Sequence, residues 1–365
     1  MPEPLAAEGG GGPRRILIVS DAWAPQVNGV VRTLSTVAAE LGRMGREVTV
    51  IGPDRFRSVA CPTYPEIRLA LLPGRRLGRM IEAFAPDALH VATEGPLGLA
   101  ARAWARRRGF GFTTSFHTRF PEYINARLGV PEGPVYAWLR RFHAAGRGMM
   151  VAAPSLRAEL TARGFRNVRA WSRGVDLDLF RPFPREAWDL PRPVFAYVGR
   201  VAVEKNIEAF LRLDLPGSKV VVGDGPLLPA LRRDYPAVRF TGARQGEALA
   251  RAYAGADVLV FPSLTDTFGL VLLEALACGT PIAGFPVTGP ADVLAGAEAP
   301  IGAIDSDLRA AALAALGADR PACRAYAERF GWRACAETFL GNLVVMRPSA
   351  WPPPARGVGV ERREG

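Results

Sequence analysis

The sequence is poor in several kinds of residue, and each scarcity narrows what the chain can be. Its four cysteines, Cys61, Cys278, Cys323 and Cys335, are scattered and form no CxxC pair, so they predict neither a disulfide framework nor a zinc site. No apolar run reaches the length that a membrane-spanning helix needs. The N-terminal residues lack a basic segment followed by an apolar one, which argues against a signal peptide and favours a cytoplasmic chain.

Lysine is scarcer still. Of the 46 basic residues only Lys205 and Lys219 are lysines, so arginine supplies nearly all of the positive charge behind the net value of +11. Because guanidinium and ammonium groups are not equivalent, Lys205 is expected to have a role that arginine cannot fill. The arginines are spread out without interleaved aromatic residues, so we expect no nucleic-acid partner. An anionic substrate or an anionic membrane surface remains as the partner.

Several ligand-binding motifs are also missing. No GxGxxG follows a predicted strand, and GxxxxGK[ST] does not occur. The dinucleotide-binding and P-loop interpretations therefore lose their main support. No HExxH motif or Cys/His cluster is present either, so nothing in the sequence indicates a metal site.

What is present is a regular alternation of short apolar runs and helical patterns. The run at 15–20 is typical of a parallel strand buried on both faces, and a helical pattern that ends near Gly45 follows it. The same rhythm continues along the first half and restarts after residue 193. This alternation predicts an α/β fold with two doubly wound parallel sheets.

A proline-rich stretch separates the two halves. It carries four prolines in thirteen residues and little periodicity, so it is interpreted as a linker. Both polar ends of the chain are expected to be disordered. Because ligands of open parallel sheets bind at the strand C-terminal ends, we expect a cleft between two domains. The predicted parts are a lead, an N-terminal domain, the linker, a C-terminal domain, helices that cross back and a tail: 1–13, 14–180, 181–193, 194–322, 323–346 and 347–365.

Two loops in the first half carry candidate site residues. Asn28-Gly29 precedes a helix, where glycine lets the backbone approach a ligand and free N–H groups attract an anion. An ordinary capped turn is the alternative. His117 directly follows a strand, whereas His90 and His143 lie inside a strand and a helix, so His117 is the histidine expected at the cleft. A structural histidine is the alternative there.

Two loops in the second half carry charged residues. Arg200 ends a strand and Lys205 lies five residues later before a helix, an arrangement that suits a diphosphate. Asp266 precedes a helix predicted to begin near Thr267, which puts Glu274 about two turns in, at ~12 Å. A glycosidase pair acting on one bond needs ~5 to 9.5 Å, so this spacing suits two separate sugars of one nucleotide sugar. Solvated charges are the alternative for both loops.

Together these loops resemble the retaining nucleotide-sugar glycosyltransferases of family 4, which have the GT-B fold of two Rossmann-like domains facing a central cleft. The resemblance runs from Arg15 to about Val345 and is carried by GRVAVEKN, VGDGP and ADVLVFPSLTDTFGLVLLEALACGTPIAG. DAWAPQVNGVVRTL and SFHTRFPEY are similar to bacterial α-mannosyltransferases and lipid-directed members. The resemblance implies transfer of a hexose to a lipid or glycan hydroxyl, with GDP-mannose as the first candidate donor and a UDP-hexose as the second.

The resemblance also implies roles for residues. Gly29 would face the phosphates and the acceptor, and His117 would reach the donor sugar. Arg200 and Lys205 would neutralise the diphosphate, and Glu274 would accept the ribose hydroxyls. The implied catalytic residues are His117, Arg200, Lys205 and Asp266. The implied donor-binding residues are Asn28, Gly29, Arg200, Lys205, Gly223, Asp266, Phe268, Gly269, Leu270 and Glu274.

The chain departs from the family pattern at two positions. Asp266 stands where most members have Glu. The side chain is therefore one methylene shorter, which leaves the donor preference open. Asn28 replaces the first residue of the usual Gly-Gly pair, a mild change because asparagine tolerates positive φ. In the final helices, Trp332 and Phe339 are expected to be packing residues.

The resemblance implies neither a metal nor another cofactor, because Arg200, Lys205 and helix-terminal amides would stabilise the leaving diphosphate. Asp176-Leu177-Asp178 spells the DxD that holds a divalent ion in other sugar transferases, but its place before the linker favours a turn.

Two other functions stay open at this point, an epimerase or hydrolase of nucleotide sugars and a non-catalytic basic binding protein. The basic pairs and triplet of the first half predict either contact with anionic lipid at the inner membrane face or ordinary solvated helix faces: Arg75-Arg76, Arg106 to Arg108 and Arg140-Arg141.

Overall fold

The computed structural model of the chain describes residues 12–24, 26, 28–61, 64–184, 188–266 and 268–346. They fall into two compact units. Unit 1 contains the chain up to Phe116, Leu139–Met150 and the chain from Phe339 onward, and unit 2 contains His117–Trp138 and Val151–Thr338. The described part of the linker has no helix or strand. The domain boundaries stay predictions, and the tail and nearly all of the lead lie outside the described residues.

The first sheet has six strands in the order β2-β1-β5-β6-β7-β8. β1 pairs in parallel with β2 on one side, where Leu17 is opposite Thr49, and with β5 on the other, where Leu17 is opposite Leu89. The chain therefore reverses its direction of progress across the sheet between β1 and β5. The strands are β1 (Arg15–Val19), β2 (Glu47–Ile51), β5 (Ala88–Val91), β6 (Phe112–Ser115), β7 (Gly148–Val151) and β8 (Val168–Ala170).

The second sheet also has six strands, in the order β11-β10-β9-β12-β13-β14. Its first strand, β9, lies between β10 and β12, and both pairings are parallel. The strand order 3-2-1-4-5-6 is one that doubly wound sheets have, so the predicted fold class is confirmed. The strands are β9 (Val194–Val198), β10 (Ser218–Val222), β11 (Arg239–Gly242), β12 (Val258–Phe261), β13 (Ile282–Gly284) and β14 (Gly302–Ile304).

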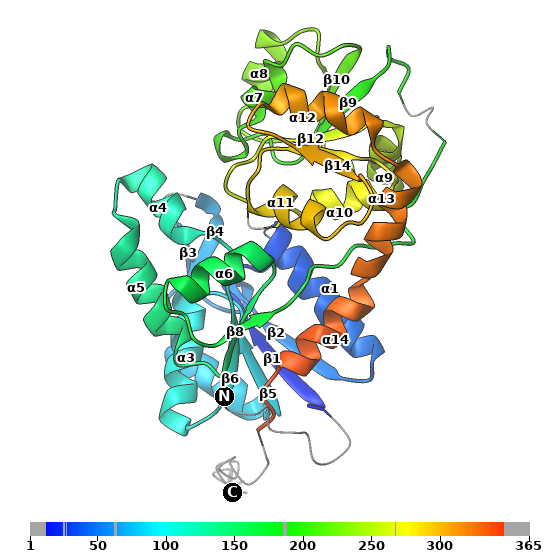
Figure 1. Cartoon of the computed structure of the whole chain (residues 1–365). Helices are drawn as coiled ribbons and strands as arrows, with labels where there is room; N and C mark the ends of the chain where they lie inside the picture. The colour runs from blue at the N-terminus through cyan, green and yellow to red at the C-terminus, as the bar shows by residue number, and fades with distance from the viewer. Residues whose placement is uncertain are drawn as a thin grey trace, which may run out of the picture. The chain divides into compact units, whose positions relative to one another are not determined.

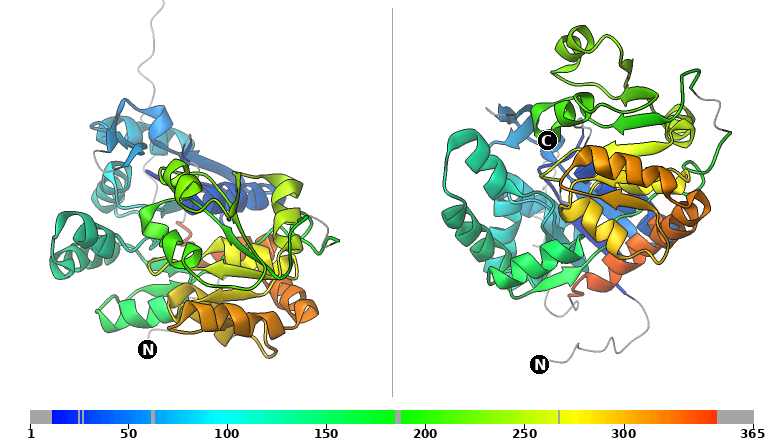
Figure 2. Two further views of the ribbon diagram at one scale, coloured as in Figure 1. Left: turned by 90° about the horizontal axis from the view of Figure 1, so that it is seen from above. Right: turned by 45° about the horizontal axis from the view of Figure 1, so that its top comes forward.

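Helices lie on both faces of each sheet, as Figure 1 and the further views in Figure 2 show. Buried strands with helices on both faces are what continuous apolar runs predict. The helices associated with the first sheet are α1 (Gly29–Arg43), α2 (Gly74–Phe84), α3 (Pro96–Arg108), α4 (Phe120–Leu128), α5 (Glu132–His143) and α6 (Pro154–Ala162). The later helices are α7 (Ile207–Leu211), α8 (Leu228–Asp234), α9 (Gly246–Gly255), α10 (Leu270–Ala277), α11 (Thr288–Ala295), α12 (Leu308–Ala314), α13 (Arg320–Ala327) and α14 (Trp332–Asn342).

Several elements were not predicted from the sequence. An antiparallel hairpin of β3 (Ser58–Cys61) and β4 (Tyr64–Ala70) follows β2, where the second sheet instead has its edge strand β11. α4, α11, α12 and β14 were also missed, whereas α5 is the helix in which His143 was placed. Short 3-10 turns also occur among the described residues: Pro53–Arg55, Val203–Lys205, Ala315–Gly317 and Glu328–Phe330.

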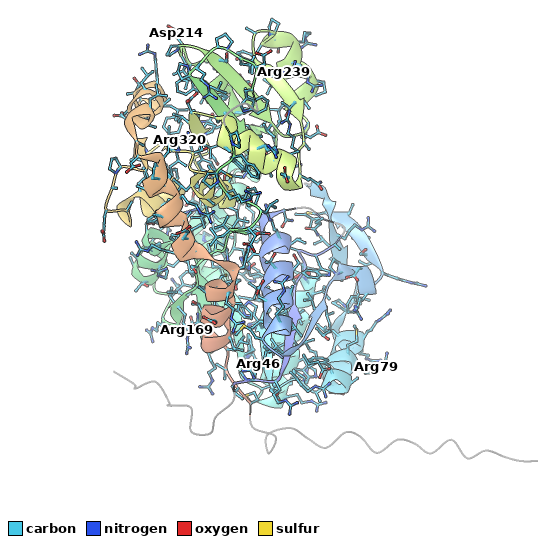
Figure 3. The ribbon with its side chains drawn as sticks, turned by 90° about the vertical axis from the view of Figure 1, so that its right-hand side faces the viewer. Arg46, Arg79, Arg169, Asp214, Arg239 and Arg320 are labelled. Carbon is cyan, nitrogen blue, oxygen red and sulfur yellow. The ribbon has the colours of Figure 1, made fainter. Side chains whose placement is uncertain are left out.

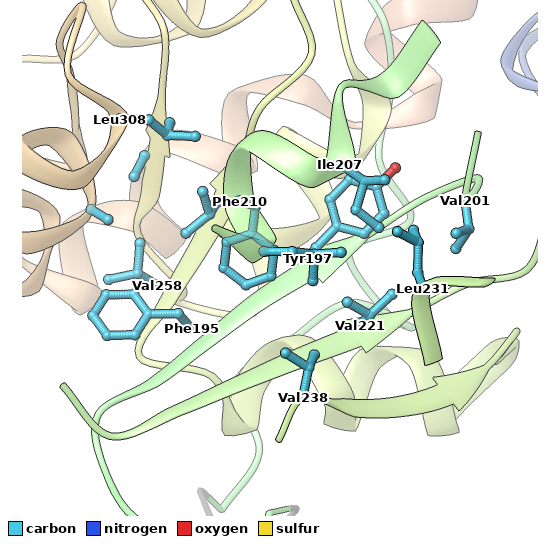
Figure 4. Packing of buried hydrophobic residues seen from close by; sticks show 14 of the residues in the cluster. Phe195, Tyr197, Val201, Ile207, Phe210, Val221, Leu231, Val238, Val258 and Leu308 are labelled. Carbon is cyan, nitrogen blue, oxygen red and sulfur yellow. The ribbon is translucent and has the colours of Figure 1, made fainter. Parts of the chain in front are cut away.

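Each sheet carries a dense apolar core. In unit 2 the rings of Phe195, Tyr197 and Phe210 pack with Val258 and Leu308 between sheet and helices (Figure 4). Removing such a side chain from water contributes roughly 1.5–3 kcal/mol, so the core holds the strand ends, and the loops that follow them, in fixed positions.

The structure also bears on the cysteines and on the predicted packing residues. None of the four cysteines, all of which are described, forms a disulfide. Trp332 and Phe339 are buried, and the Phe339 ring meets the edge of His90 with centroids 4.8 Å apart. Within the described part of the chain, no helix is long and apolar enough to cross a membrane.

Arginine side chains project from many different elements. Figure 3 labels five of them, Arg46, Arg79, Arg169, Arg239 and Arg320, and they come from a loop, two helices and two strands. These five arginines are thus spread over different elements and are not gathered in one tract.

Candidate functional site

The second sheet places two loops side by side where its strand order reverses. β9 and β12 are neighbours in the sheet, but the chain leaves β9 toward β10 on the opposite side. The loops after β9 and β12 are therefore not separated by a crossover helix, and open sheets bind ligands at such points. Arg200 and Lys205 belong to the first loop, and Asp266 belongs to the second.

Lys205 and Asp266 meet across this point. The Lys205 Nζ donates to Asp266 Oδ1 at 2.5 Å, and their side chains are only 26% and 19% exposed. A partly shielded ion pair interacts more strongly than one in open water. The structure thus brings together two of the predicted catalytic residues, which lie 61 positions apart in the sequence.

Arg200 lies beside this pair on the same loop. Its guanidinium is partly exposed and 3.6 Å from the Glu204 carboxylate, and its backbone carbonyl accepts a 2.7 Å hydrogen bond from the Tyr197 hydroxyl. Burial, and then the carboxylates of Asp266 and Glu204, raise the pKa of Tyr197. The hydroxyl therefore stays protonated and keeps donating to this loop.

Glycine lets the loop after β10 approach the loop after β9. A Cβ at Gly223 would lie 1.8 Å from the Gly199 carbonyl oxygen, and Gly223 has a φ of 155°. Val201 N also donates to the carbonyl of Asp224 at 2.8 Å. Gly223, predicted to bind the donor, thus has at least a packing role that any side chain would disrupt.

The prediction for the start of the helix after Asp266 was wrong. α10 begins at Leu270 rather than near Thr267, because Gly269 adopts a left-handed conformation that an α-helix cannot contain. Phe268 is buried, and Gly269 leaves the backbone close to the Phe261 ring. Glu274 is consequently the fifth residue of the helix, just over one turn from its start.

Glu274 is more enclosed than expected. Glu274 is only 3% exposed, and its Oε2 accepts a 2.7 Å hydrogen bond from the hydroxyl of Tyr253 on α9. Tyr253 is itself fully buried. Sequence reasoning missed Tyr253, because an apolar helical pattern gives no sign of which hydroxyl faces an acid on another helix.

His117 lies two residues after β6 and is buried. Its Nδ1 is 2.9 Å from Nη2 of Arg173, and its ring meets the edge of Trp171 with centroids 5.7 Å apart. Arg173 was also missed. Its place after the strand β8, before Gly-Val-Asp, was the available signal, because a polar residue after a parallel strand faces the ligand-binding edge.

Asn28 and Gly29 belong to unit 1, at the start of α1. Asn28 is extended, with a φ of −151°, and its Oδ1 accepts hydrogen bonds of 3.0 Å from the amides of Val30 and Val31. Asn28 is therefore a helix cap, and its tolerance of positive φ is not used at this position. Gly29 is the first helical residue.

The DxD sequence forms a turn, as predicted. Asp176 Oδ1 accepts hydrogen bonds from the backbone amides of Asp178 and Leu179 at 3.2 and 3.0 Å. Across the described residues, no three His, Cys, Asp or Glu side chains lie close enough together to hold a metal ion. At the switch point of the second sheet the structure pairs Lys205 with Asp266, and Arg200 lies on the same loop as Lys205.

This arrangement is suited to a ligand that is both anionic and hydroxylated. An ammonium and a guanidinium at the end of parallel strands can bind a diphosphate, and a neighbouring carboxylate can accept hydrogen bonds from sugar hydroxyls. A partly exposed cation beside a carboxylate needs little reorganisation to exchange part of that contact for a ligand.

Comparison with known proteins supports the same conclusion. The family model described as Glycosyltransferase Family 4 matches residues 27–179, and Glycosyl transferases group 1 matches residues 192–319. A GDP-mannose-dependent alpha-mannosyltransferase of Mycobacterium tuberculosis is 32% identical over 307 residues, which cover 77% of this chain and 81% of that protein. A GDP-mannose-dependent alpha-(1-6)-phosphatidylinositol dimannoside mannosyltransferase of the same species is 27% identical, over 92% of this chain and 97% of that protein.

The fold has close solved counterparts. The sucrose-phosphate synthase of Thermosynechococcus elongatus superposes with a TM-score of 0.67 at 20% identity, covering 89% of this chain and 96% of that one. This similarity shows the GT-B fold, with its two parallel-sheet α/β domains. Together with the family models and the 32% identical relative, it establishes that the chain is a glycosyltransferase that belongs to family 4.

Proposed function

We propose that the protein transfers mannose from GDP-mannose to a hydroxyl group of a lipid or glycan acceptor, with retention of the anomeric configuration and without a metal ion. The observation that carries the proposal is the Lys205–Asp266 pair at the switch point of the second sheet. The two mannosyltransferases named above support the choice of donor.

The proposed division of labour follows from the chemistry of the side chains. Lys205 and Arg200 hold the diphosphate and stabilise the negative charge that develops on it as the sugar leaves. Asp266 accepts hydrogen bonds from the sugar hydroxyls, and Glu274 accepts those of the ribose. Two protein cations supply the positive field, so the reaction needs no divalent ion in this proposal.

The pair also defines the electrostatics of the site. Asp266 neutralises Lys205, and the 2.5 Å hydrogen bond holds both side chains in one geometry. A bound diphosphate would contact an ammonium group that Asp266 already holds in position, so the ammonium would not first have to be desolvated and ordered. Preorganisation of this kind lowers the cost of ordering a long, flexible side chain when ligand binds.

Retention is proposed to occur by attack of the acceptor hydroxyl on the same face from which the diphosphate leaves. The departing phosphate oxygen takes the acceptor proton, so no separate protein nucleophile is needed. Domain closure would exclude water, which would otherwise act as the acceptor.

A direct assay tests the proposal. The protein is incubated with radiolabelled GDP-mannose or UDP-glucose, with and without a lipid extract and with excess EDTA. We expect acceptor-dependent transfer from GDP-mannose that EDTA leaves unchanged, with the α linkage of the product shown by nuclear magnetic resonance. Free mannose or an epimer formed without acceptor would instead identify a hydrolase or epimerase, and loss of activity with EDTA would contradict the metal-free mechanism.

We further propose that unit 1 contacts an anionic membrane through a basic hollow between α2 and α3. The two helices carry seven arginines and a single acid. Arg75, Arg79, Arg107 and Arg108 line a hollow of about 540 Å³, and the buried indole of Trp104 forms part of its wall. A guanidinium cluster of this kind suits the phosphate of a lipid headgroup.

The hollow has an apolar neighbour that favours a membrane over a soluble phosphate. Leu71 and Leu72 directly precede α2, and Leu72 is 96% exposed in a left-handed conformation with a φ of 45°. Neither the exposure of this large apolar side chain nor its uncommon backbone conformation is explained by packing within the protein. At a bilayer surface it could enter the interface while the arginines contact headgroups.

Vesicle sedimentation tests this contact. We expect binding to vesicles that contain phosphatidylglycerol but not to phosphatidylcholine alone. Arg75→Gln/Arg79→Gln should reduce binding about tenfold or more, because each arginine near the surface contributes ~1 kcal/mol. The matched control, Arg232→Gln/Arg233→Gln on α8, removes the same charge elsewhere and should change binding less than twofold. Equal losses in both variants would show that only net charge matters.

A further inference from the structure

The geometry points to a positioning role for Arg173: it holds His117 as a neutral imidazole whose proton is on Nε2, so that His117 acts only as a hydrogen-bond donor toward the donor sugar. This inference rests on the proposed function for the placement of the sugar. Its central claim, the tautomer of His117, can be measured on the protein alone.

A guanidinium can donate hydrogen bonds but cannot accept them. All polar hydrogens of Arg173 are on nitrogen, and the group has no acceptor site. Its Nη2 lies 2.9 Å from Nδ1 of His117, a distance typical of a hydrogen bond. Nδ1 must therefore offer its lone pair, so a neutral ring carries its hydrogen on Nε2. A ring protonated on both nitrogens would place two N–H groups against each other.

Arg173 is held in place by an aromatic neighbour. Its guanidinium carbon lies 4.9 Å from the centre of the Trp171 ring, within the range of a cation–π contact. Trp171 is fully buried, and its Nε1 donates to the carbonyl of Cys335 at 3.3 Å. The same indole forms a T-shaped contact with the His117 ring, with centroids 5.7 Å apart. The three side chains therefore fix each other's orientation.

The burial of Arg173 is hard to explain by packing alone. The residue is 6% exposed, and within the described parts of the chain no carboxylate forms an ion pair with it. Its Nη1 is buried and has no hydrogen-bond partner among those residues. Burial lowers the pKa of Arg173 to about 10, so the group is still charged at neutral pH. Burying an uncompensated cation is unfavourable, and an apolar side chain would fill the space at lower cost.

The fixed tautomer limits the chemistry of His117. An Nε2–H donates a hydrogen bond, so it selects an oxygen that can accept one, such as a sugar hydroxyl or ring oxygen. It cannot take the proton of the acceptor hydroxyl, because Nε2 has no free lone pair. This assignment agrees with a mechanism in which the departing phosphate, and not a histidine, removes that proton.

Nitrogen resonances of the histidine rings provide the first test. The chain has only three histidines, so a sample labelled with ¹⁵N-histidine gives few signals, and His117→Gln identifies those of His117. We expect Nδ1 of His117 to resonate as an unprotonated, pyridine-like nitrogen and Nε2 as a protonated, pyrrole-like one. The reverse pattern, or a ring protonated on both nitrogens at neutral pH, would overturn the inference even if mannosyl transfer is confirmed.

Two substitutions provide the second test. Arg173→Met keeps an unbranched stem against Trp171 but removes the donor, and Arg173→Lys keeps a donor and its charge. We expect Arg173→Met to mix the two tautomers and to lower kcat/KM about tenfold to a hundredfold, because the sugar loses a fixed contact. GDP affinity should change less than twofold. Arg173→Lys should retain the Nε2–H tautomer and recover most of the activity.

A double variant separates positioning from general damage. If Arg173 acts through His117, then adding Arg173→Met to His117→Gln should lower activity no further. Additive losses, or an Arg173→Met protein that keeps the wild-type tautomer and still loses activity, would show that Arg173 acts by another route. Thermal unfolding of each variant checks that the proteins compared are folded.

Discussion

The two sheets have the same kind of switch point, but different residues occupy it. In unit 1 the loops after β1 and β5 carry Asp21 and Thr93. Asp21 is buried, and its two carboxylate oxygens accept hydrogen bonds of 2.9 and 3.2 Å from the amides of Leu97 and Gly98 at the start of α3. The Thr93 hydroxyl donates to the same carboxylate at 2.9 Å. Unit 1 thus fills its own anion position.

Unit 2 leaves the corresponding position open. No side chain of the described residues caps the start of α10, which follows β12, and Lys205 and Asp266 next to it remain partly exposed. A free helix start beside a cation suits an external anion, whereas α3 already has an internal one. A shared strand order therefore does not determine which sheet can take up an external anion. The residues of the loops that follow the strands determine it.

The largest expected effect is on the open switch point. Lys205→Ala should lower kcat roughly 10²- to 10³-fold, the range seen when one preorganised electrostatic contact to the transition state is lost. Initial rates with GDP-mannose measure the loss, and circular dichroism confirms the fold.

The other lysine is the matched control. Lys219 on β10 donates to the backbone carbonyls of Leu211 and Leu213, away from the loops after β9 and β12. Lys219→Ala should retain activity within about threefold once its smaller stability loss of roughly 1 kcal/mol is allowed for. Similar turnover for the two variants would remove the ground for placing the diphosphate at Lys205.

The second effect concerns the switch point of unit 1, which the Asp21 carboxylate fills. Asp21→Ala should lower the free energy of unfolding by about 2–3 kcal/mol, because two buried amides and a hydroxyl lose their acceptor. GDP affinity of the folded protein should stay within twofold of wild type, since Lys205, Arg200 and Glu274, which are proposed to bind the diphosphate and the ribose, belong to unit 2. Urea denaturation and isothermal titration measure the two quantities. A large loss of GDP affinity at unchanged stability would reverse the comparison.

These two switch points also show what could be predicted from the sequence. Apolar runs and helical patterns located nearly all of the sheet strands, because strands buried on both faces must be apolar throughout. Lys205 stood out because the chain has only two lysines among its 46 basic residues. The pairing of Lys205 with Asp266 could not be predicted, because it depends on strand order and not on separation along the chain.

The misses have similar physical causes. The helix after Asp266 was started too early, because a side-chain pattern does not reveal the left-handed backbone of Gly269. For Asn28 the capped turn, which had been left open as the alternative, is what the structure shows, and the tolerance of positive φ is not used. Asp21, Tyr253 and Arg173 act through partners that are distant in the sequence, and neither motif nor periodicity reports such contacts.

The third prediction sharpens the role of the acid at the open switch point. Asp266→Asn removes the charge that neutralises Lys205 but keeps the shape of the side chain. We expect kcat/KM for GDP-mannose to fall roughly ten- to thirtyfold, because a carboxylate accepts hydrogen bonds from hydroxyls more strongly than an amide does. GDP affinity should be unchanged or higher, since Lys205 is released toward the phosphates. A parallel loss of GDP affinity would place Asp266 against the nucleotide and not against the sugar.

The smallest expected effect concerns the support behind the open switch point. Tyr253→Phe removes the 2.7 Å hydrogen bond to Glu274 and leaves a buried carboxylate with one donor fewer. We expect a loss of about 1–2 kcal/mol in unfolding free energy and a three- to fivefold rise in the KM for GDP-mannose, because the carboxylate that is proposed to bind the ribose becomes less well held. Tyr235→Phe, on the partly buried tyrosine that ends α8, is the control and should leave KM unchanged. If Tyr253→Phe lowers stability while KM stays at the wild-type value, then Glu274 is a structural acid of the α9–α10 contact and the ribose must be held elsewhere.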